Sequence, residues 1–183
     1  DTITPTLDNV TIASSNSVST LAKTSDRITL SITSAGAIQA PSVKIAGQTS
    51  TVTGSGASWS AYYDMQSSAN EWTVSLNIGF SDLAGNAGDN VTSTKDDSAV
   101  QFDRTLPVLQ PVDNVTTPTS DNTSLSYIFH STEAGTINYS VCSGSPDNAS
   151  AGNNPITFDA LADGTHSNCE ISVTDNASNT SYN

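Results

Sequence analysis

Two short motifs occur twice in this chain in the same order, and this repetition constrains the fold more than any single residue does. The segment Asp1–Pro5 has the pattern D-x-x-x-P and returns at Asp103–Pro107. The segment Asp82–Asn86 has the pattern D-x-A-x-N and returns at Asp175–Asn179. Repetition of this kind is typical of chains built from tandem copies of one domain. The sequence therefore predicts two domains, residues 1–102 and 103–183, each the size of a small β-sandwich.

Short stretches of alternating apolar and polar residues predict strands in both halves. Ser and Thr make up roughly a third of the chain and helix-favouring residues are scarce, which favours strands and turns. Ile28, Leu30 and Ile32, for example, alternate with polar residues at the period of a strand with one buried face. The first half is predicted to form strands at 6–13, 27–33, 42–46, 49–53, 58–64, 73–80 and 90–102. The second half is predicted to form strands at 124–129, 135–141, 156–158 and 168–174.

Short strands at this spacing, with glycine-containing turns and no helical period, predict an all-β fold of two antiparallel β-sandwiches. Trp59 and Trp72 are expected to pack in or near the first core. Only four residues follow Asn179, whereas a complete closing strand is predicted after Asn86. We therefore expect the second domain either to lack its last strand or to be cut from a larger protein, the second being favoured. An open strand edge would accept a partner strand.

The charge of the chain excludes some classes of partner. Its formal net charge is −13, with five basic and eighteen acidic residues, and no Lys or Arg follows Arg104. Such a field repels phosphate backbones and anionic lipids, so neither nucleic acid nor a membrane surface is an expected partner. The two cysteines, Cys142 and Cys169, both lie in the second repeat and predict one disulfide within that domain, in an extracellular or cell-surface environment.

Several segments resemble the bacterial Ig-like domains that are repeated in large secreted adhesins. In the first half they are Asp1–Pro5, Val10–Ser14, Pro41–Gly47 and Phe80–Asn86. The second half resembles a sister type from the same proteins through Pro118–Asn122, Ser131–Ile137 and Leu161–Cys169. The resemblance implies two tandem Ig-like sandwiches in a surface array, whose partners are neighbouring repeats of the same chain. Many such domains carry Tyr after the D-G-T turn where this chain has His166, which implies that His166 is a structural corner residue.

Acidic and amide side chains are predicted to gather at one end of each sandwich, where the first strand and two loops meet. Oxygen ligands of this kind suit Ca²⁺. In the second repeat the predicted ligands of an interdomain site are Asp103, Glu133, Asp175 and Asn179. In the first repeat they are Asp1, Asp82 and Asn86, with Ala35 or Gly36 in the place of Glu133, which predicts a weaker site. The alternative is that D-x-A-x-N is a turn in which Asp and Asn bond to nearby backbone amides without a metal.

These observations favour a non-catalytic module that extends and spaces other domains of a large extracellular protein. No nucleophile elbow, metalloprotease motif or redox motif occurs in the sequence, so an enzyme is not expected. One alternative is a module that binds a surface glycan or protein through Tyr62, Tyr63 and Trp72. Another is the subunit of a surface filament that is completed by a neighbour's strand.

Overall fold

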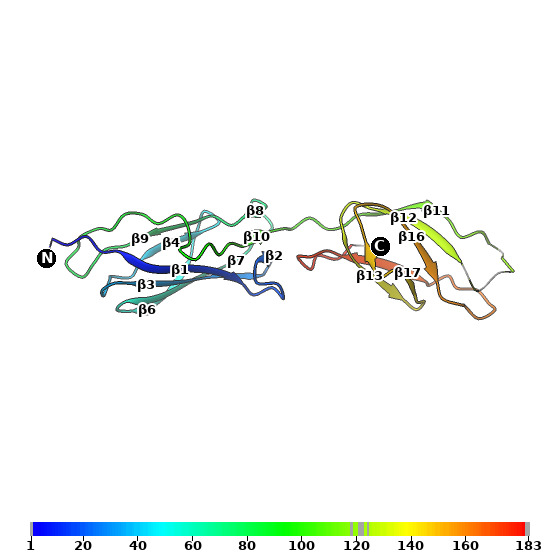
Figure 1. Ribbon diagram of the computed structural model, residues 1–183, viewed down its shortest axis with the longest axis horizontal. Coiled ribbons are helices and arrows are strands. Elements are labelled where there is room, and N and C mark those ends of the chain that lie inside the picture. Colours follow the sequence, from blue (N-terminus) through cyan, green and yellow to red (C-terminus); the bar gives the residue numbers. More distant parts are fainter. Residues whose placement is uncertain (1, 118, 121–122, 124, 182–183) are drawn as a thin grey trace. The chain divides into compact units, whose positions relative to one another are not determined.

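The computed structural model describes residues 2–117, 119–120, 123 and 125–181 and divides the chain into two compact units (Figure 1). The first unit is Asp1–Arg104 and the second is Thr105–Asn183, which places the boundary two residues after the predicted one. The described residues form strands and no helix, so the prediction of an all-β fold is confirmed.

Antiparallel sheets make up the two layers of the first unit. One sheet has the order β1-β3-β7-β6, formed by Leu7–Ser14, Arg27–Ser34, Ser58–Asp64 and Thr51–Ser55. A second has the order β5-β4-β9, formed by Gln48–Thr49, Ser42–Ile45 and Leu76–Gly79. A small mixed sheet, β2-β10-β8, joins Leu21–Ala22, Gln101–Phe102 and Trp72–Thr73, and β10 runs parallel to β2.

The core of the first unit follows the predicted alternation. Ile28, Leu30 and Ile32 on β3 are at most 1% exposed, while the residues between them face outward or are half-buried. From the opposite sheet, Val43 and Ile78 are also buried in this cluster. The period of two therefore identifies the inner faces of both sheets.

The predicted strand 90–102 is wrong over most of its length. Val91 forms an isolated bridge with Ile78, and only Gln101–Phe102 is regular strand. Between them the chain turns, because Asp97 has a φ of 59° and the Asp96 carboxylate accepts hydrogen bonds from both the backbone and the hydroxyl of Ser98. A residue in the left-handed region interrupts a strand. We call residues 87–102 the closing segment.

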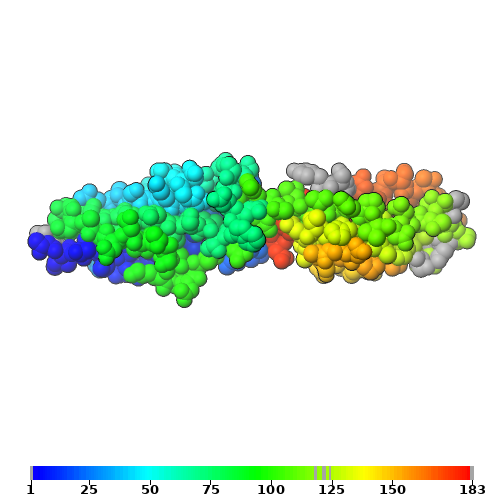
Figure 2. All heavy atoms as spheres, turned by 90° about the horizontal axis from the view of Figure 1, so that it is seen from above, coloured from blue at the N-terminus to red at the C-terminus, as the bar shows by residue number. Residues whose placement is uncertain are grey.

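The closing segment nevertheless completes the first unit. It bonds to β9 through Val91 and to β1 through the backbone N–H of Lys95, which donates to the carbonyl of Val10 at 2.9 Å. Val100 and Phe102 are 0% and 1% exposed, so their side chains belong to the core. In Figure 2 this part of the chain, in green, spreads over one face of the first unit.

The second unit has the same two-layer plan. One sheet has the order β11-β12-β16-β14, formed by Leu109–Asp113, Ser126–Ser131, Gly152–Phe158 and Gly144–Ser145. The other has the order β15-β13-β17, formed by Asn148–Ala149, Gly135–Ser140 and Glu170–Thr174. The sequence did not predict β11, because Pro111 interrupts its pattern. Proline is tolerated there since β11 is at the edge of its sheet.

The second core is smaller than the first. Its buried cluster, among the described residues, consists of Phe129, Ile137, Ala149, Ile156 and Val173. Around it, Leu109, Tyr127, Phe158 and Ile171 are only partly buried. The inner face of this unit is therefore covered less completely than that of the first unit.

Glycine is required where β13 meets β17. A Cβ on Gly135 would collide with the backbone carbonyl of Thr174, whereas one on Gly36 would meet nothing within 4 Å. We expect Gly135→Ala to lower the free energy of unfolding of the second unit by about 1–3 kcal/mol, because the β13–β17 pairing must spread. Gly36→Ala, the matched control in the first unit, is expected to change stability by less than about 0.5 kcal/mol.

Denaturant-dependent hydrogen exchange resolves the two units and measures both effects. Equal destabilisation by the two substitutions would contradict the close approach at Gly135.

Candidate functional site

The D-x-A-x-N motif forms the same hydrogen-bonded turn in both units. In the first unit the Asp82 carboxylate accepts the backbone N–H of Asn86 at 2.8 Å and the side-chain amide of Asn86 at 2.7 Å. In the second unit the Asp175 carboxylate accepts the corresponding groups of Asn179 at 2.8 and 2.9 Å. Each aspartate N–H also donates to the carbonyl of its asparagine, at 3.0 and 2.9 Å. The motif thus forms a turn closed by its own side chains.

These bonds lower the pKa of Asp82 in the turn of the first unit. The side-chain amide of Asn86 is the largest influence that lowers the pKa of Asp82, and the backbone N–H groups of Asn86, Ala84 and Gly85 lower it further. Desolvation opposes them. The net effect is a pKa below the ordinary value, because several donors stabilise the charged form.

A buried serine marks a second equivalent position in the two units. Ser34 at the end of β3 pairs with Leu7, and its hydroxyl donates to the carbonyl of Gly36 at 2.6 Å. Ser131 at the end of β12 pairs with Leu109, and its hydroxyl donates to the carbonyl of Glu133 at 2.6 Å. Gly36, rather than Ala35, is thus the counterpart of Glu133.

The predicted calcium ligands are distributed between the units. Asp103 belongs to the first unit, where its N–H donates to the carbonyl of Ala22 at 2.8 Å, whereas Glu133 and Asp175 belong to the second. Asp1 lies outside the described residues. In the described part of the chain, no group of three or more His, Cys, Asp or Glu is placed to hold a metal ion. Calcium binding stays a prediction.

Of the aromatic residues predicted as an alternative binding surface, Tyr62 and Tyr63 lie on β7 and Trp72 lies on β8. Tyr62 on β7 stacks under Arg27, whose Cζ lies 4.1 Å from the ring centre, and Tyr63 packs against the core. Trp72 is 79% exposed, so the prediction that it packs in or near the core is wrong. Trp72 lies in the two-residue strand β8, but its φ of 86° is in the left-handed region, which a regular strand does not adopt. Trp59 packs partly against the core, as predicted.

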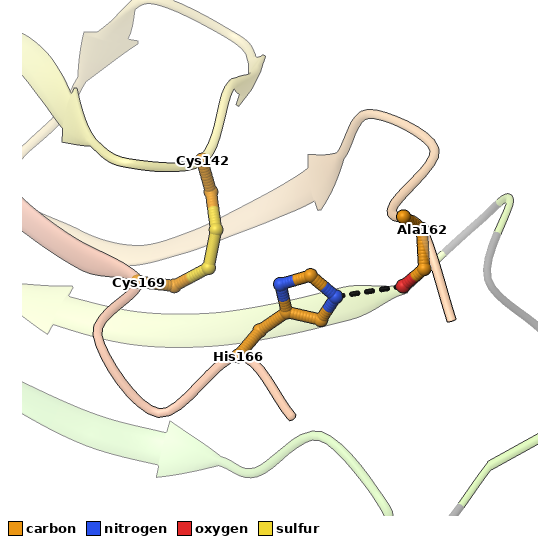
Figure 3. The surroundings of a disulfide bond; sticks show 4 residues. All are labelled: Cys142, Ala162, His166 and Cys169. Atoms are coloured by element: carbon orange, nitrogen blue, oxygen red, sulfur yellow. Dashed lines mark hydrogen bonds between the residues drawn. A yellow bond between two sulfur atoms is a disulfide. The ribbon is translucent and has the colours of Figure 1, made fainter. Parts of the chain in front are cut away.

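The predicted disulfide is confirmed. Cys142 follows β13 and Cys169 precedes β17, and their Cα atoms are 5.3 Å apart (Figure 3). The bond links two neighbouring strands of one sheet at the point where their pairing ends. Nearby, the ring of His166 donates from Nε2 to the carbonyl of Ala162 at 2.7 Å (Figure 3). The His166 side chain therefore bonds across the loop that precedes β17.

A groove of about 920 Å³ opens between the two sheets of the second unit. Aromatic side chains of Tyr127, Phe129 and Phe158 line it, with β11 on one side and Ile171 of β17 on the other. The sequence analysis did not identify these lining residues as a site, because they come from strands far apart in the chain.

The described part of the chain contains no helix of the length and hydrophobicity that crossing a membrane requires. Comparison with known proteins finds no matching family model, no matching curated protein and no matching solved structure.

The disulfide closes a loop of 27 residues in sequence separation. Replacing both Cys142 and Cys169 by Ser should lower the free energy of unfolding of the second unit by about 3 kcal/mol, because the unfolded chain gains conformational freedom. Hydrogen exchange should show faster opening in β13 and β17 with no change in the first unit, which is the internal control. A loss shared equally by both units would argue against a local effect.

The lowered pKa of Asp82 links the stability of the first unit to pH. Its contribution is present above the pKa of the unfolded chain, about 3.9, and is lost as pH falls through the lower pKa of the folded state. Asp82→Asn should therefore lower the Tm of the first unit at pH 7 and weaken its pH dependence below about pH 4.

Tryptophan fluorescence follows the first unit alone, because Trp59 and Trp72 are the two tryptophans of the chain. Asp89→Asn makes the same charge change at an exposed position and is the matched control. An equal effect of the two substitutions would show that net charge, not the turn, is responsible.

Proposed function

We propose that this chain is a pair of Ig-like spacer domains in an extracellular, adhesin-like protein. The observation that carries the proposal is the repeated framework of the two units. The Asp–Asn turn and the serine-to-carbonyl bond occur at corresponding places in both, next to equivalent strands. A chain that repeats one self-contained sandwich adds length without adding a new kind of site.

The strand orders support an Ig-like sandwich. The order β1-β3-β7-β6 corresponds to sheet ABED of an Ig constant-type domain, and β4 paired with β9 corresponds to strands C and F of the other sheet. The second unit has the same pairings in β11-β12-β16 and β13-β17. Two units with their own cores and equivalent strands are what a tandem array requires.

Charge and covalent structure favour an extracellular setting. The net charge of −13 opposes lateral association between parallel arrays, since surfaces of like charge repel. The Cys142–Cys169 disulfide is stable in oxidising compartments and rare in the cytosol. Pro107, three residues after Arg104, restricts the backbone where the units join.

Small-angle X-ray scattering tests the spacer function. Two units held apart should give a radius of gyration above about 20 Å, whereas one compact body of this length would give about 16 Å. The value should not change with protein concentration. A radius near the compact value, or growth with concentration, would contradict a spacer.

The same measurement with chelator and with millimolar CaCl₂ tests the calcium that the proposal includes. Calcium at the junction should narrow the distance distribution in the original chain and in Asp89→Asn, but not in Asp103→Asn. An identical distribution in chelator and in CaCl₂ would remove calcium from the proposal and leave the spacer function in place.

A further inference from the structure

The first unit shows what closes the side of such a sandwich. Ile78 on β9 uses both of its backbone groups for Val91: its N–H donates to the Val91 carbonyl at 2.9 Å, and its carbonyl accepts the Val91 N–H at 3.0 Å. Further along, Lys95 donates through Nζ to the carbonyl of Leu7 at 2.6 Å, on β1. The closing segment thus bridges the two sheets and inserts Val100 and Phe102 into the core.

The second unit begins the same arrangement. Ser181 N–H donates to the carbonyl of Val173 at 2.9 Å, as Gly88 N–H does to Phe80 at 3.0 Å in the first unit. Thr174 bridges Thr180, as Ser81 bridges Ala87. The described residues that pair with the outer edge of β17 are thus Thr180 and Ser181.

Beyond these two residues the outer edge of β17 continues at Ile171. Ile171 and Ile78 both lie four residues before the turn aspartate, so they occupy equivalent positions. Val173 directs its N–H and carbonyl outward to Ser181, and backbone groups in an antiparallel strand alternate in direction. The N–H and carbonyl of Ile171, two residues away, therefore lie on the same outer edge.

The groove of the second unit lies between the strands that correspond to β1 and β9, which are the strands that the closing segment joins in the first unit. Leu109, the counterpart of Leu7, and Ile171, the counterpart of Ile78, line its two sides. Tyr127 and Phe129 of β12 line it from within. Its volume is about 920 Å³.

We propose that this groove binds an extended strand from outside these 183 residues, with the chemistry of the closing segment. The strand pairs its backbone with Ile171 and places apolar side chains over Tyr127 and Phe129. It also carries a lysine that reaches the carbonyl of Leu109, as Lys95 reaches Leu7. A basic residue complements this unit, which contains no Lys or Arg and has Glu170 beside the groove. Addition of a strand to an open sheet edge is an established mode of peptide binding.

A second copy of the chain is not the occupant that these contacts favour. The closing segment is the stretch that matches the groove, and its Val100 and Phe102 are buried in its own unit. Donating it would open the first core, where deleting buried side chains of this size costs several kcal/mol each. The proposal does not depend on the spacer function, since either could hold without the other.

The test titrates the complete chain into a fluorescent peptide with the sequence of residues 87–103 and follows anisotropy. We expect saturable binding in the range of about 1–100 μM, typical of weak peptide docking. Hydrogen exchange of the complex should slow at β17 and remain unchanged at β9, which separates groove binding from displacement in the first unit.

Two altered peptides are the matched controls. Methylation of the backbone nitrogen that corresponds to Val91 removes the hydrogen bond to Ile171 and should weaken binding at least about tenfold. Replacing the valine and phenylalanine that correspond to Val100 and Phe102 by serine should abolish it. On the protein, Ile171→Ser should weaken binding, while Val141→Ser, 72% exposed and outside the groove, should not.

Absence of saturable binding at about 1 mM peptide, or equal binding of the methylated peptide, would overturn the proposal. Sedimentation of the chain alone distinguishes the other occupant. A dimer that excludes the peptide would show that a second copy fills the groove, and it would also overturn the proposal.

Discussion

Burial of alternate apolar side chains between two sheets is the interaction on which both units depend. In a sandwich of this kind the two sheets cover each other's inner faces, and a further segment must cover the apolar side chains at the open side between the sheets. In the first unit Val100 and Phe102 of the closing segment provide that cover. In the second unit Tyr127 and Ile171 remain only partly buried beside a groove. The closing segment therefore accounts for part of the difference between the two cores.

The ends of the sheets are held by local bonds instead of by the core. Asp82 and Asp175 each bind the asparagine four residues later, and Ser34 and Ser131 each bind a carbonyl two residues later. Such bonds satisfy backbone groups where strand pairing stops. They recur in both units although the strands between them differ in length, which is why the repeated motif survives as a structural unit.

These features relate the fold to its proposed role. A spacer needs units that fold separately and present few surfaces for association, and the acidic charge and separate cores meet both needs. The groove of the second unit adds a specific contact to this general role, because its edge at Ile171 and its apolar lining select an extended strand. Both units would then contribute to the length of the spacer, and the groove of the second unit would bind the added strand.

Much of this protein could be predicted from sequence because the signals were local. The alternation at Ile28, Leu30 and Ile32 and the D-x-A-x-N turns depend on residues whose spacing determines their geometry. The disulfide could be predicted because the sequence has two cysteines, both in the second repeat. Tertiary structure decided what depends on distant partners. It exposed Trp72 and formed β11 despite Pro111, because burial and edge position outweigh local strand preference. The groove too is a tertiary property, since its lining comes from strands far apart in the sequence.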